Sequence, residues 1–293
     1  MTLPLSTEEA LSCILSAVSV LPAENIPVRK SLGRVLAENL GAPRSMPDLP
    51  CSAVDGYAVQ ADQGPDFNVV MEVRAGILPE KVLVPGQAAA IMTGAVLPKG
   101  ADCLVMVEDC LIEGQKLTTP DNLKAGDLIN PVGDEISAGD VFVEKGTLIG
   151  PSVFPALFCA GITEICVHRN PRVGILISGD EVREIEDGPA PGQVFNTNSY
   201  IIEAVCASLG VEIVETCAVV DDELQTRNLL KNLEKRCDVV ITSGGISRGR
   251  YDHLGAILRG DGYDLLLQST AIKPGRPLHV ARGEGGALIF GMP

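Results

Sequence analysis

The chain begins with an amphipathic pattern that predicts a helix. Ser6 and Glu9 have the spacing of a capping box, in which each side chain accepts a hydrogen bond from a backbone amide at the start of a helix. Apolar residues then recur with a helical period at Ala10, Leu11, Ile14, Leu15 and Val18. Because proline lacks the amide that a helix interior needs, we expect this helix to end by Pro22.

Residues 23–150 carry a different pattern, in which short apolar runs alternate with Gly and Pro. Runs of this length between turn-forming residues are typical of short β-strands. We therefore predict a β-rich region with strands at residues 82–84, 88–92, 104–107, 116–117 and 141–143. A short helix is expected after Pro151, because an apolar stripe runs from Val153 to Leu157 and Gly161 follows it.

From Pro171 onward, apolar runs alternate with amphipathic stretches, which predicts alternating strands and helices. The predicted strands lie at residues 173–177, 211–220, 239–242 and 287–290. The first of them is continuously apolar, as in a strand covered on both faces. We expect Asn198 and Asp222 to cap two of the helices and a third helix to lie at 253–258. This order predicts a parallel sheet with right-handed crossovers.

Polar residues cluster where the first three of these strands end, and ligands of an open parallel sheet bind beyond the carboxyl ends of its strands. The clusters are Ser178-Gly179-Asp180-Glu181, then Asp221-Asp222, then Ser243-Gly244-Gly245-Ile246-Ser247 with Asp252 after it. Glycines let backbone amides approach phosphate oxygens, and converging carboxylates favour a bound cation. The sequence therefore predicts a phosphate-binding loop and an Mg²⁺ site at one crevice.

A basic loop at 273–277, which contains Lys273, Pro274 and Arg276, adds the positive charge that an anionic ligand requires in an acidic protein. Each feature also has a plainer interpretation. The Gly-rich loop alone is explained as a turn, Asp222 as a helix cap, and Glu181, Lys273 and Arg276 as solvated side chains. Their joint placement at successive strand ends favours a binding site.

The β-rich region holds three further candidate segments. Asp55 lies among small residues in the segment 52–58, Thr93 lies beside a glycine, and Glu135 follows another acidic residue after Gly133. A carboxylate or hydroxyl in a loop is a candidate for contact with a ligand. Taken alone, each segment is also explained as an ordinary turn.

Composition narrows the classes of function. The 293 residues include 23 Lys plus Arg against 38 Asp plus Glu, a formal charge of −15, which argues against binding to nucleic acid or to an anionic membrane. Nine scattered cysteines without a CxxC pair argue against a disulfide scaffold or a zinc knuckle. The sequence contains no zinc-hydrolase, P-loop or GxGxxG spacing. It shows neither a signal-peptide pattern nor an apolar run of about 20 residues, so we expect a cytoplasmic protein.

Taken together, the motifs resemble those of one family, the MoeA proteins and the gephyrin E domain, which are molybdopterin molybdenumtransferases. The first half of the resemblance rests on SAVDGYA at 52–58, IMTGA at 91–95, PKGAD at 98–102 and GDEI at 133–136. The second half rests on SGDEV at 178–182, Asn198, Asp221-Asp222, TSGGIS at 242–247 and KPGRP at 273–277. Because these motifs occur in collinear order over nearly the whole chain, the resemblance is specific.

The resemblance implies an α/β plus β fold, in which a multi-domain elongated chain combines a β-rich lobe with a parallel-sheet α/β domain of the MoaB/MogA type that binds molybdopterin. The implied domains are an elongated helix-containing linker domain at 1–40 and 141–170, a β-rich domain at 41–140 and an α/β domain at 171–293. The family's C-terminal β domain does not appear in the sequence. We therefore expect a truncated chain, and the sequence leaves open whether the truncation is natural.

The implied activity is a late step of molybdenum cofactor biosynthesis. Molybdate is inserted into adenylated molybdopterin with release of AMP, and Mg²⁺ assists. The resemblance further implies a homodimer, in which each site combines the α/β domain of one chain with the β-rich domain of the other. A molybdopterin adenylyltransferase of the MogA type and molybdoenzyme acceptors are the partners that such an activity implies, and no nucleic acid or membrane partner is expected.

The family's functional residues transfer to matching positions of this sequence. Asp55, Thr93 and Glu135 are assigned to the β side of the catalytic site, and Glu181, Asp221 and Asp252 to the α/β side. The last three are also the expected metal ligands. The residues expected to bind molybdopterin are Ser178, Gly179, Asp180, Ser243, Gly244, Gly245, Ser247, Lys273, Pro274 and Arg276.

Two departures from the family pattern support an alternative function. Asp134-Glu135 reverses the family's Glu-Asp order, and Arg250 stands where an acidic residue is usual. Together with the missing C-terminal domain, they are consistent with a catalytically impaired paralog that binds molybdopterin or acts as a scaffold. The sequence also leaves the choice between molybdate and tungstate open.

Overall fold

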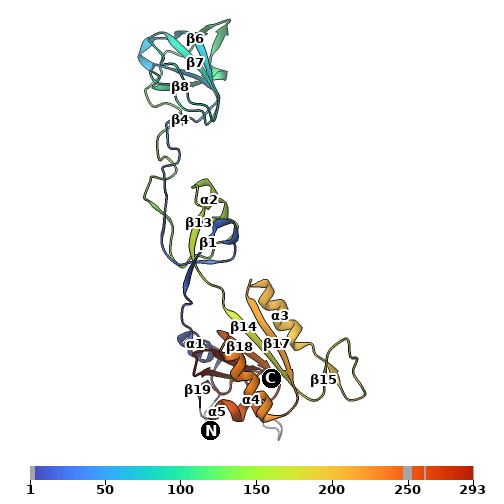
Figure 1. The fold of residues 1–293 in the computed structure, drawn as a ribbon. Coiled ribbons are helices and arrows are strands. Elements are labelled where there is room, and N and C mark those ends of the chain that lie inside the picture. Colours follow the sequence, from blue (N-terminus) through green and yellow to red (C-terminus); the bar gives the residue numbers. More distant parts are fainter. Residues whose placement is uncertain (1–3, 247–252, 261, 293) are drawn as a thin grey trace. The chain divides into compact units, whose positions relative to one another are not determined.

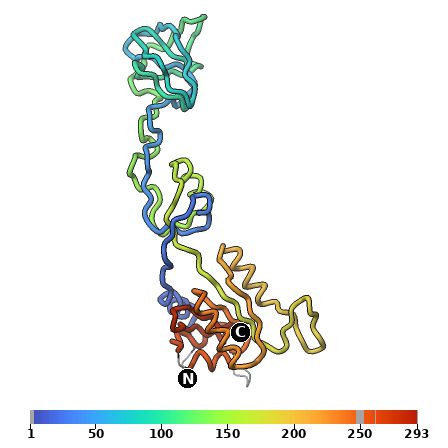
Figure 2. The backbone as a smooth tube through the Cα atoms, viewed as in Figure 1, coloured from blue at the N-terminus to red at the C-terminus, as the bar shows by residue number. Residues whose placement is uncertain are grey.

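The computed structural model describes residues 4–246, 253–260 and 262–292, and its backbone is drawn in Figure 1 and Figure 2. The chain divides into two compact units. The first consists of residues 1–26, 33–35 and 166–293, and the second of residues 27–32 and 36–165. The division into three domains that the sequence suggests stays a prediction.

The first unit is built on a six-stranded sheet with the order β17-β14-β18-β21-β20-β19 (Figure 1). Its strands are β14 (Arg172–Ser178), β17 (Glu212–Val219), β18 (Val239–Ser243), β19 (Tyr263–Leu267), β20 (His279–Gly283) and β21 (Leu288–Met292). β14 pairs parallel with both β17 and β18, and β18 pairs parallel with β21, as predicted. β19 and β20 are antiparallel and were not predicted, so the sheet is mixed rather than wholly parallel.

Helices cover both faces of this sheet, which explains the continuous apolar sequence of β14. The helices are α3 (Asn198–Ser208), α4 (Glu223–Glu234) and α5 (His253–Arg259). Val173, Ile175 and Ile177 of β14 share a buried cluster with Ile202 of α3. Leu176 lies on the opposite face in a second cluster with residues of α4 and α5. Because successive side chains of a strand alternate between its faces, one short strand contributes to both cores.

The helix α1 (Thr7–Ala17) begins at the predicted capping box. Ser6 Oγ accepts a hydrogen bond from the Glu9 amide at 3.2 Å, and Glu9 Oε2 accepts one from the Ser6 amide at 2.8 Å. Ala10 is buried in a cluster with Leu267 and Val280, which attaches the helix to the antiparallel edge of the sheet. The helix ends at Ala17, ahead of Pro22, as expected.

The two helix caps predicted after residue 171 have different outcomes. Asp222 caps α4, because its Oδ1 accepts a hydrogen bond from the Gln225 amide at 2.7 Å. The predicted cap at Asn198 is wrong, because Asn198 is itself the first residue of α3. Asn196 instead accepts a hydrogen bond from the Ser199 amide at 3.2 Å. The side chain of Asn198 is therefore available for a contact elsewhere.

The second unit holds another six-stranded sheet, with the order β8-β5-β7-β6-β10-β9. Its strands are β5 (Gly56–Val59), β6 (Asp66–Val73), β7 (Gln87–Ile91), β8 (Cys103–Met106), β9 (Leu111–Glu113) and β10 (Lys116–Thr118). The predictions at 88–92, 104–107 and 116–117 correspond to β7, β8 and β10. The strand predicted at 82–84 is wrong: only Leu83 of that run is buried, while Val82 and Val84 are exposed and join no ladder.

The central strand β5 explains part of the segment 52–58. All four of its residues are buried, with Tyr57 and Val59 in one apolar cluster and Ala58 in another. Gly56 lies against β8, where an added Cβ would collide with the carbonyl oxygen of Val105. Only glycine therefore permits this pairing directly after Asp55.

The remaining strands form smaller sheets, with the orders β1-β13-β2, β11-β4, β12-β3 and β15-β16. They are β1 (Ala23–Pro27), β2 (Val35–Leu36), β3 (Leu40–Gly41), β4 (Cys51–Ser52), β11 (Ile129–Asn130), β12 (Val141–Val143), β13 (Glu164–His168), β15 (Val182–Arg183) and β16 (Val194–Phe195). β12 and the helix α2 (Val153–Cys159) confirm the elements predicted at 141–143 and after Pro151. Among the described residues, no helix has the length and apolar character needed to span a membrane.

Asp238 anchors the start of the first unit's sheet. Its two carboxylate oxygens each accept a hydrogen bond from the Arg169 guanidinium at 2.6 Å, and one also accepts the Arg172 amide at 2.8 Å. Its side chain is 17% exposed. The hydrogen bonds from Arg169 lower the pKa of the Asp238 carboxyl and outweigh the effect of its burial. The carboxylate thus holds the residues that enter β14 and β18 together.

We predict that Asp238→Ala lowers the free energy of unfolding by about 2–3 kcal/mol, because it leaves the Arg169 guanidinium without its bidentate partner. Urea denaturation followed by circular dichroism measures the loss. The matched control is Glu72→Ala, which removes the partner of Arg74 in an exposed pair and should change stability little. Equal stability of Asp238→Ala and the native protein would contradict this role.

Candidate functional site

A cavity of about 250 Å³ lies where β14 and β18 end. Part of its wall comes from these strand ends, and the rest comes from the segment that precedes α3. The residues around it are Ile177, Ser178, Glu181, Val182, Val194, Phe195, Asn196, Thr197, Asn198, Ser243 and Gly244. The parallel pairing of β14 with β18 brings their carboxyl ends to the same edge, as the sequence predicts.

Ser178, Asp180 and Asp221 form a hydrogen-bonded group at this edge. Ser178 Oγ donates to Asp221 Oδ1 at 3.1 Å, and the Asp221 amide donates to Asp180 Oδ1 at 3.2 Å. β14 and β17 carry these residues together because they pair in register up to Ser178 and Val219. The group fixes the orientation of the Asp221 carboxylate beside the cavity.

The glycine-rich loop after β18 approaches β14 closely. Gly244 has a φ of +89°, and an added Cβ would collide with the carbonyl oxygen of Ser178. Ser243 is buried, and its Oγ accepts a hydrogen bond from Asn198 Nδ2 at 2.7 Å. Gly245 also has a positive φ and lies over Ser178. These contacts join the strand ends to the start of α3, and Gly244 borders the cavity.

The predicted metal ligands are only partly described by the structure. Glu181 borders the cavity, and its carboxylate folds back over Gly179, where an added Cβ would lie 2.9 Å from Glu181 Oε2. Asp252 and Ser247 lie outside the described residues. Within residues 4–246, 253–260 and 262–292, no group of three or more His, Cys, Asp or Glu side chains has an arrangement that would hold a metal ion.

The predicted basic loop lies at the same edge of the sheet as the cavity. It connects β19 to β20, and His279, at the start of β20, pairs with Gly291 near the end of the parallel strand β21. The loop is closed by Thr270, whose amide donates to the Arg276 carbonyl at 3.0 Å. Lys273, Pro274 and Arg276 are exposed and do not border the cavity.

In the second unit, the structure joins Asp55 directly to Thr93. Asp55 Oδ1 accepts hydrogen bonds from the Thr93 amide at 2.7 Å and from the Thr93 hydroxyl at 2.9 Å. The hydrogen bond from the Thr93 amide and, to a lesser extent, the hydrogen bond from the Thr93 hydroxyl hold the pKa of the exposed Asp55 carboxyl below its usual value. Glu135 is exposed, and the only hydrogen bond seen for it in the described chain is that of its amide with the Met46 carbonyl.

Several residues around the cavity were not singled out as site residues from the sequence. Phe195 and Asn196 border it, and Asn198 reaches Ser243 instead of capping its helix. The polar run at 196–198 between an apolar pair and a helix is the available signal, but the sequence analysis uses only its last residue, Asn198, as a helix cap and as part of the family resemblance. Local pattern alone does not show that the preceding segment folds back over the strand ends.

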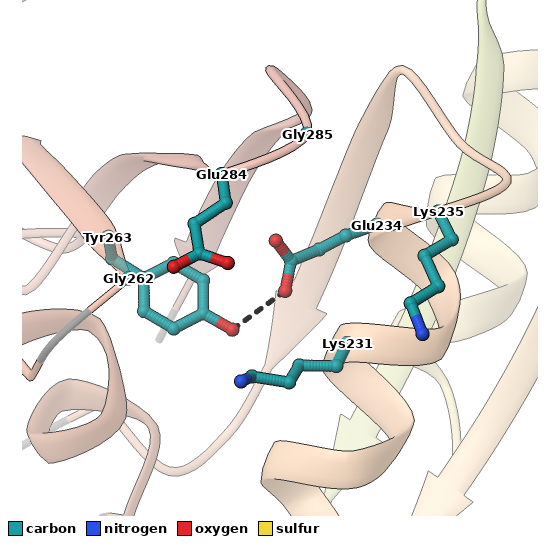
Figure 3. Close-up of a pocket in the computed structure, with 7 residues that line it drawn as sticks. All are labelled: Lys231, Glu234, Lys235, Gly262, Tyr263, Glu284 and Gly285. Atoms are coloured by element: carbon teal, nitrogen blue, oxygen red, sulfur yellow. Dashed lines mark hydrogen bonds between the residues drawn. The ribbon is translucent and has the colours of Figure 1, made fainter.

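A second cavity, of about 310 Å³, lies at the opposite edge of the same sheet (Figure 3). Tyr263 and Glu234 border it, and the tyrosine hydroxyl donates to Glu234 Oε1 at 2.7 Å. Burial and then this hydrogen bond raise the pKa of the Tyr263 hydroxyl. Lys231, Lys235 and Glu284 also border it, so two lysines balance the charges of two glutamates. None of the residues that border this cavity is a predicted site residue.

His279 is a buried histidine beside the site. It is 4% exposed, and neither ring nitrogen has a hydrogen-bond partner among the described residues. Burial, and then the charge of Arg259, lower the pKa of its imidazole, with a partial opposing effect from the Pro277 carbonyl. The folded structure therefore favours the neutral form of this imidazole.

A lowered pKa in the folded state makes stability depend on pH. Above pH 6.5, His279 is neutral in both states; as pH falls below that, the unfolded state takes up a proton first, so stability declines. We predict that His279→Leu removes this decline, which for one proton is at most about 1.4 kcal/mol per pH unit. Urea denaturation at several values between pH 5 and pH 7.5 measures it. Parallel pH profiles for the two proteins would contradict the assignment.

Comparison with known proteins identifies the family to which both units correspond. The model of the MoeA N-terminal region (domain I and II) matches residues 5–161, and that of a probable molybdopterin binding domain matches residues 174–293. The chain belongs to the MoeA family. The MoeA N-terminal match contains Asp55 and Thr93, and the binding-domain match contains the cavity residues.

Named relatives agree with this assignment. The chain is 32% identical to a molybdopterin molybdenumtransferase of Staphylococcus epidermidis, over 99% of this chain and 71% of that protein. It is 31% identical to a protein of the same name from Staphylococcus aureus with the same coverage. The crystal structure of a molybdopterin biosynthesis MoeA protein from Pyrococcus horikoshii OT3 is similar, with a TM-score of 0.84, 29% identity and coverage of 99% of this chain and 74% of that chain. The MoeA-like α/β plus β fold expected from the sequence is confirmed.

Proposed function

We propose that this chain is a molybdopterin molybdenumtransferase that acts in molybdenum cofactor biosynthesis. In the proposed reaction, molybdate is inserted into adenylated molybdopterin, the phosphoanhydride is cleaved and AMP is released. Membership of the MoeA family and the names of its relatives support this activity. The single structural observation that carries the proposal is the cavity at the ends of β14 and β18. There Ser178 orients Asp221, and Gly244, which packs closely against Ser178, exposes its backbone to the cavity.

The cavity has features that suit a substrate with a ring system and polar groups. Val182, Val194 and Phe195 give it an apolar side, while Ser178 and Asn198 supply hydrogen-bonding groups. Pockets for small ligands combine these two kinds of wall, the apolar part for affinity and the polar part for orientation. We propose that Ser178, Gly179, Asp180, Ser243, Gly244, Gly245 and Ser247 bind the molybdopterin part, with Lys273, Pro274 and Arg276 near its charged groups.

Mg²⁺ is the cation that fits the donor groups at this edge. Proteins commonly hold it through one or two carboxylates together with substrate phosphates and water. Asp221 and Glu181 offer such carboxylates, and we propose that they hold the ion together with Asp252. When bound, Mg²⁺ would offset the negative charge of the substrate phosphates. Ser178 keeps Asp221 oriented for this task.

The Asp55–Thr93 pair is the proposed contribution of the second unit. The lowered pKa of Asp55 keeps its carboxylate ionised, and both hydrogen bonds from Thr93 fix where the negative charge lies. A fixed charge that needs no reorganisation during the reaction contributes to catalysis. We propose that Asp55 and Thr93 position the oxyanion substrate and that Glu135 assists from the loop after Gly133.

We expect Asp55→Asn to lower the rate of molybdate insertion about 100-fold or more without lowering the melting temperature, because the side chain is exposed and keeps its shape. The assay combines the protein with molybdate, Mg²⁺ and adenylated molybdopterin and measures AMP release. Asp66→Asn is the matched control, since Asp66 accepts a hydrogen bond from the Thr118 hydroxyl at 2.8 Å in the same unit. Equal rates for the two variants would overturn the role of Asp55.

The catalytically impaired paralog remains the second candidate, because the Glu135 side chain makes no hydrogen bond in the described chain and Asp134-Glu135 reverses the family's residue order. A native protein that binds molybdopterin but releases no AMP in this assay would favour that function. The double change Asp134→Glu with Glu135→Asp restores the family order. If it restored AMP release, the departure itself would be the cause of the impairment.

We propose that the protein works as a homodimer in the cytoplasm, with sites that take Asp55 from one chain and Asp221 from the other. All nine cysteines are free thiols, which suits a reducing compartment. A MogA-type molybdopterin adenylyltransferase and molybdoenzyme acceptors are the proposed partners, because they would supply the substrate and accept the product. No nucleic acid or membrane takes part in this proposal.

Coexpression of two inactive variants tests the shared site. Asp55→Asn and Asp221→Asn chains that pair at random would form mixed dimers in which one site carries both changes and the other carries none. We expect the mixture to recover about a quarter of native AMP release. Size-exclusion chromatography with light scattering checks that the variants are dimers. No recovery from a mixture of dimers would contradict the shared arrangement.

A further inference from the structure

The outer wall of the cavity is formed by a segment that leaves the sheet after β14 and returns before α3. Figure 2 shows this excursion as a loop that extends away from the sheet. Its two ends pair in parallel, with Val182 opposite Val194 and Arg183 opposite Phe195. The returning end supplies residues 194–198 of the cavity lining. The shape of the cavity therefore depends on how this returning end is held.

One carboxylate holds the returning end at two points. Glu184 Oε1 accepts a hydrogen bond from Asn196 Nδ2 at 2.8 Å, and Glu184 Oε2 accepts one from the Tyr200 hydroxyl at 3.1 Å. Asn196 is buried, and its own oxygen accepts the Ser199 amide at the start of α3. Glu184 thus links the outgoing end of the loop to the returning end and to the first turn of the helix.

The position of Asn196 determines where Phe195 and Asn198 lie along the cavity wall. Phe195 directly precedes Asn196, is 45% exposed and borders the cavity. Asn198 lies two residues after Asn196 and reaches Ser243 at the end of β18. The Asn196 amide also donates to the Arg183 carbonyl at 2.8 Å. A group held by backbone and side-chain bonds at once loses little freedom when a ligand binds, so less binding energy is spent on ordering it.

We infer that Glu184 is a positioning residue for the molybdopterin site, and that the Glu184–Asn196–Tyr200 contact sets the wall against which the substrate binds. This inference rests on the proposed function, because it concerns the same cavity. Glu184 acts through Asn196 and Phe195 and is not itself among the residues that border the cavity. Hydrogen bonds to a charged acceptor are stronger than those between neutral groups, which suits a carboxylate to this task.

The test compares the binding of molybdopterin to the native protein and to variants by isothermal titration calorimetry. We expect Glu184→Ala to raise the dissociation constant about tenfold, because the unanchored wall must be ordered when the ligand binds. Glu184→Gln should bind within about twofold of native, since its amide still meets Asn196 and Tyr200. Tyr200→Phe removes one of the two bonds and should weaken binding about threefold.

The matched control is Glu203→Ala. Glu203 lies in α3 and, like Glu184, accepts a hydrogen bond from a hydroxyl, that of Thr216 at 2.7 Å, but it does not border the cavity. Hydrogen–deuterium exchange supplies a second readout. We expect Glu184→Ala to speed exchange within residues 185–197 and to leave the strands of the sheet as protected as in the native protein.

The outcomes separate this inference from the proposed function. If the native protein binds no molybdopterin, the proposed function fails. If the native protein binds and Glu184→Ala binds equally well, or if Glu203→Ala weakens binding as much, the positioning role of Glu184 is overturned. A fold defect in Glu184→Ala leaves Tyr200→Phe as the test, and unchanged binding by that variant would also overturn the role.

Discussion

The parallel pairing of β14 with both β17 and β18 is the constraint on which the candidate site depends. Parallel strands end at the same edge of a sheet, and here that edge receives Ser178, Asp221 and Gly244 from three separate segments. The pairing is stable because β14 is buried on both faces, by α3 on one side and by α4 and α5 on the other. Fixing the strands therefore fixes where the residues of the site lie.

Polar contacts at this edge orient the side chains that the strands bring there. Ser178 orients Asp221, Asn198 reaches Ser243, and Gly244 allows two backbone segments to come within a distance that a side chain would forbid. The excursion before α3 supplies part of the cavity wall. In the second unit, the Asp55–Thr93 pair has the corresponding role, because the amide and the hydroxyl of Thr93 both donate to the Asp55 carboxylate and fix its orientation. In both units, short hydrogen-bonded loops rest on buried strands.

Much of this fold could be predicted from local sequence pattern. The capping box at Ser6 and Glu9, the cap at Asp222 and the buried run of β14 are local signals, and the structure confirms each of them. The cap at Asn198 is wrong because the helix already includes Asn198, and Asn196 accepts the Ser199 amide instead. The strand expected at 82–84 failed because an apolar run of three residues forms a strand only where a neighbouring strand pairs with it.

Contacts between distant residues account for what the sequence pattern could not show. β19 and β20 are short and partly polar, and they become strands by pairing at the edge of the sheet. Asp55 and Thr93 are 38 residues apart, so only the family resemblance, and not the pattern, linked them to one site. The Glu184 contact lies outside every motif of that resemblance and became visible only in the structure.

A crystal structure of the protein bound to molybdopterin tests the central claim most directly. The account predicts the ligand at the carboxyl ends of β14 and β18, in contact with Ser178, Asn198 and the backbone of Gly244. A ligand bound instead beside Tyr263 and Glu234, at the opposite edge of the same sheet, would contradict it.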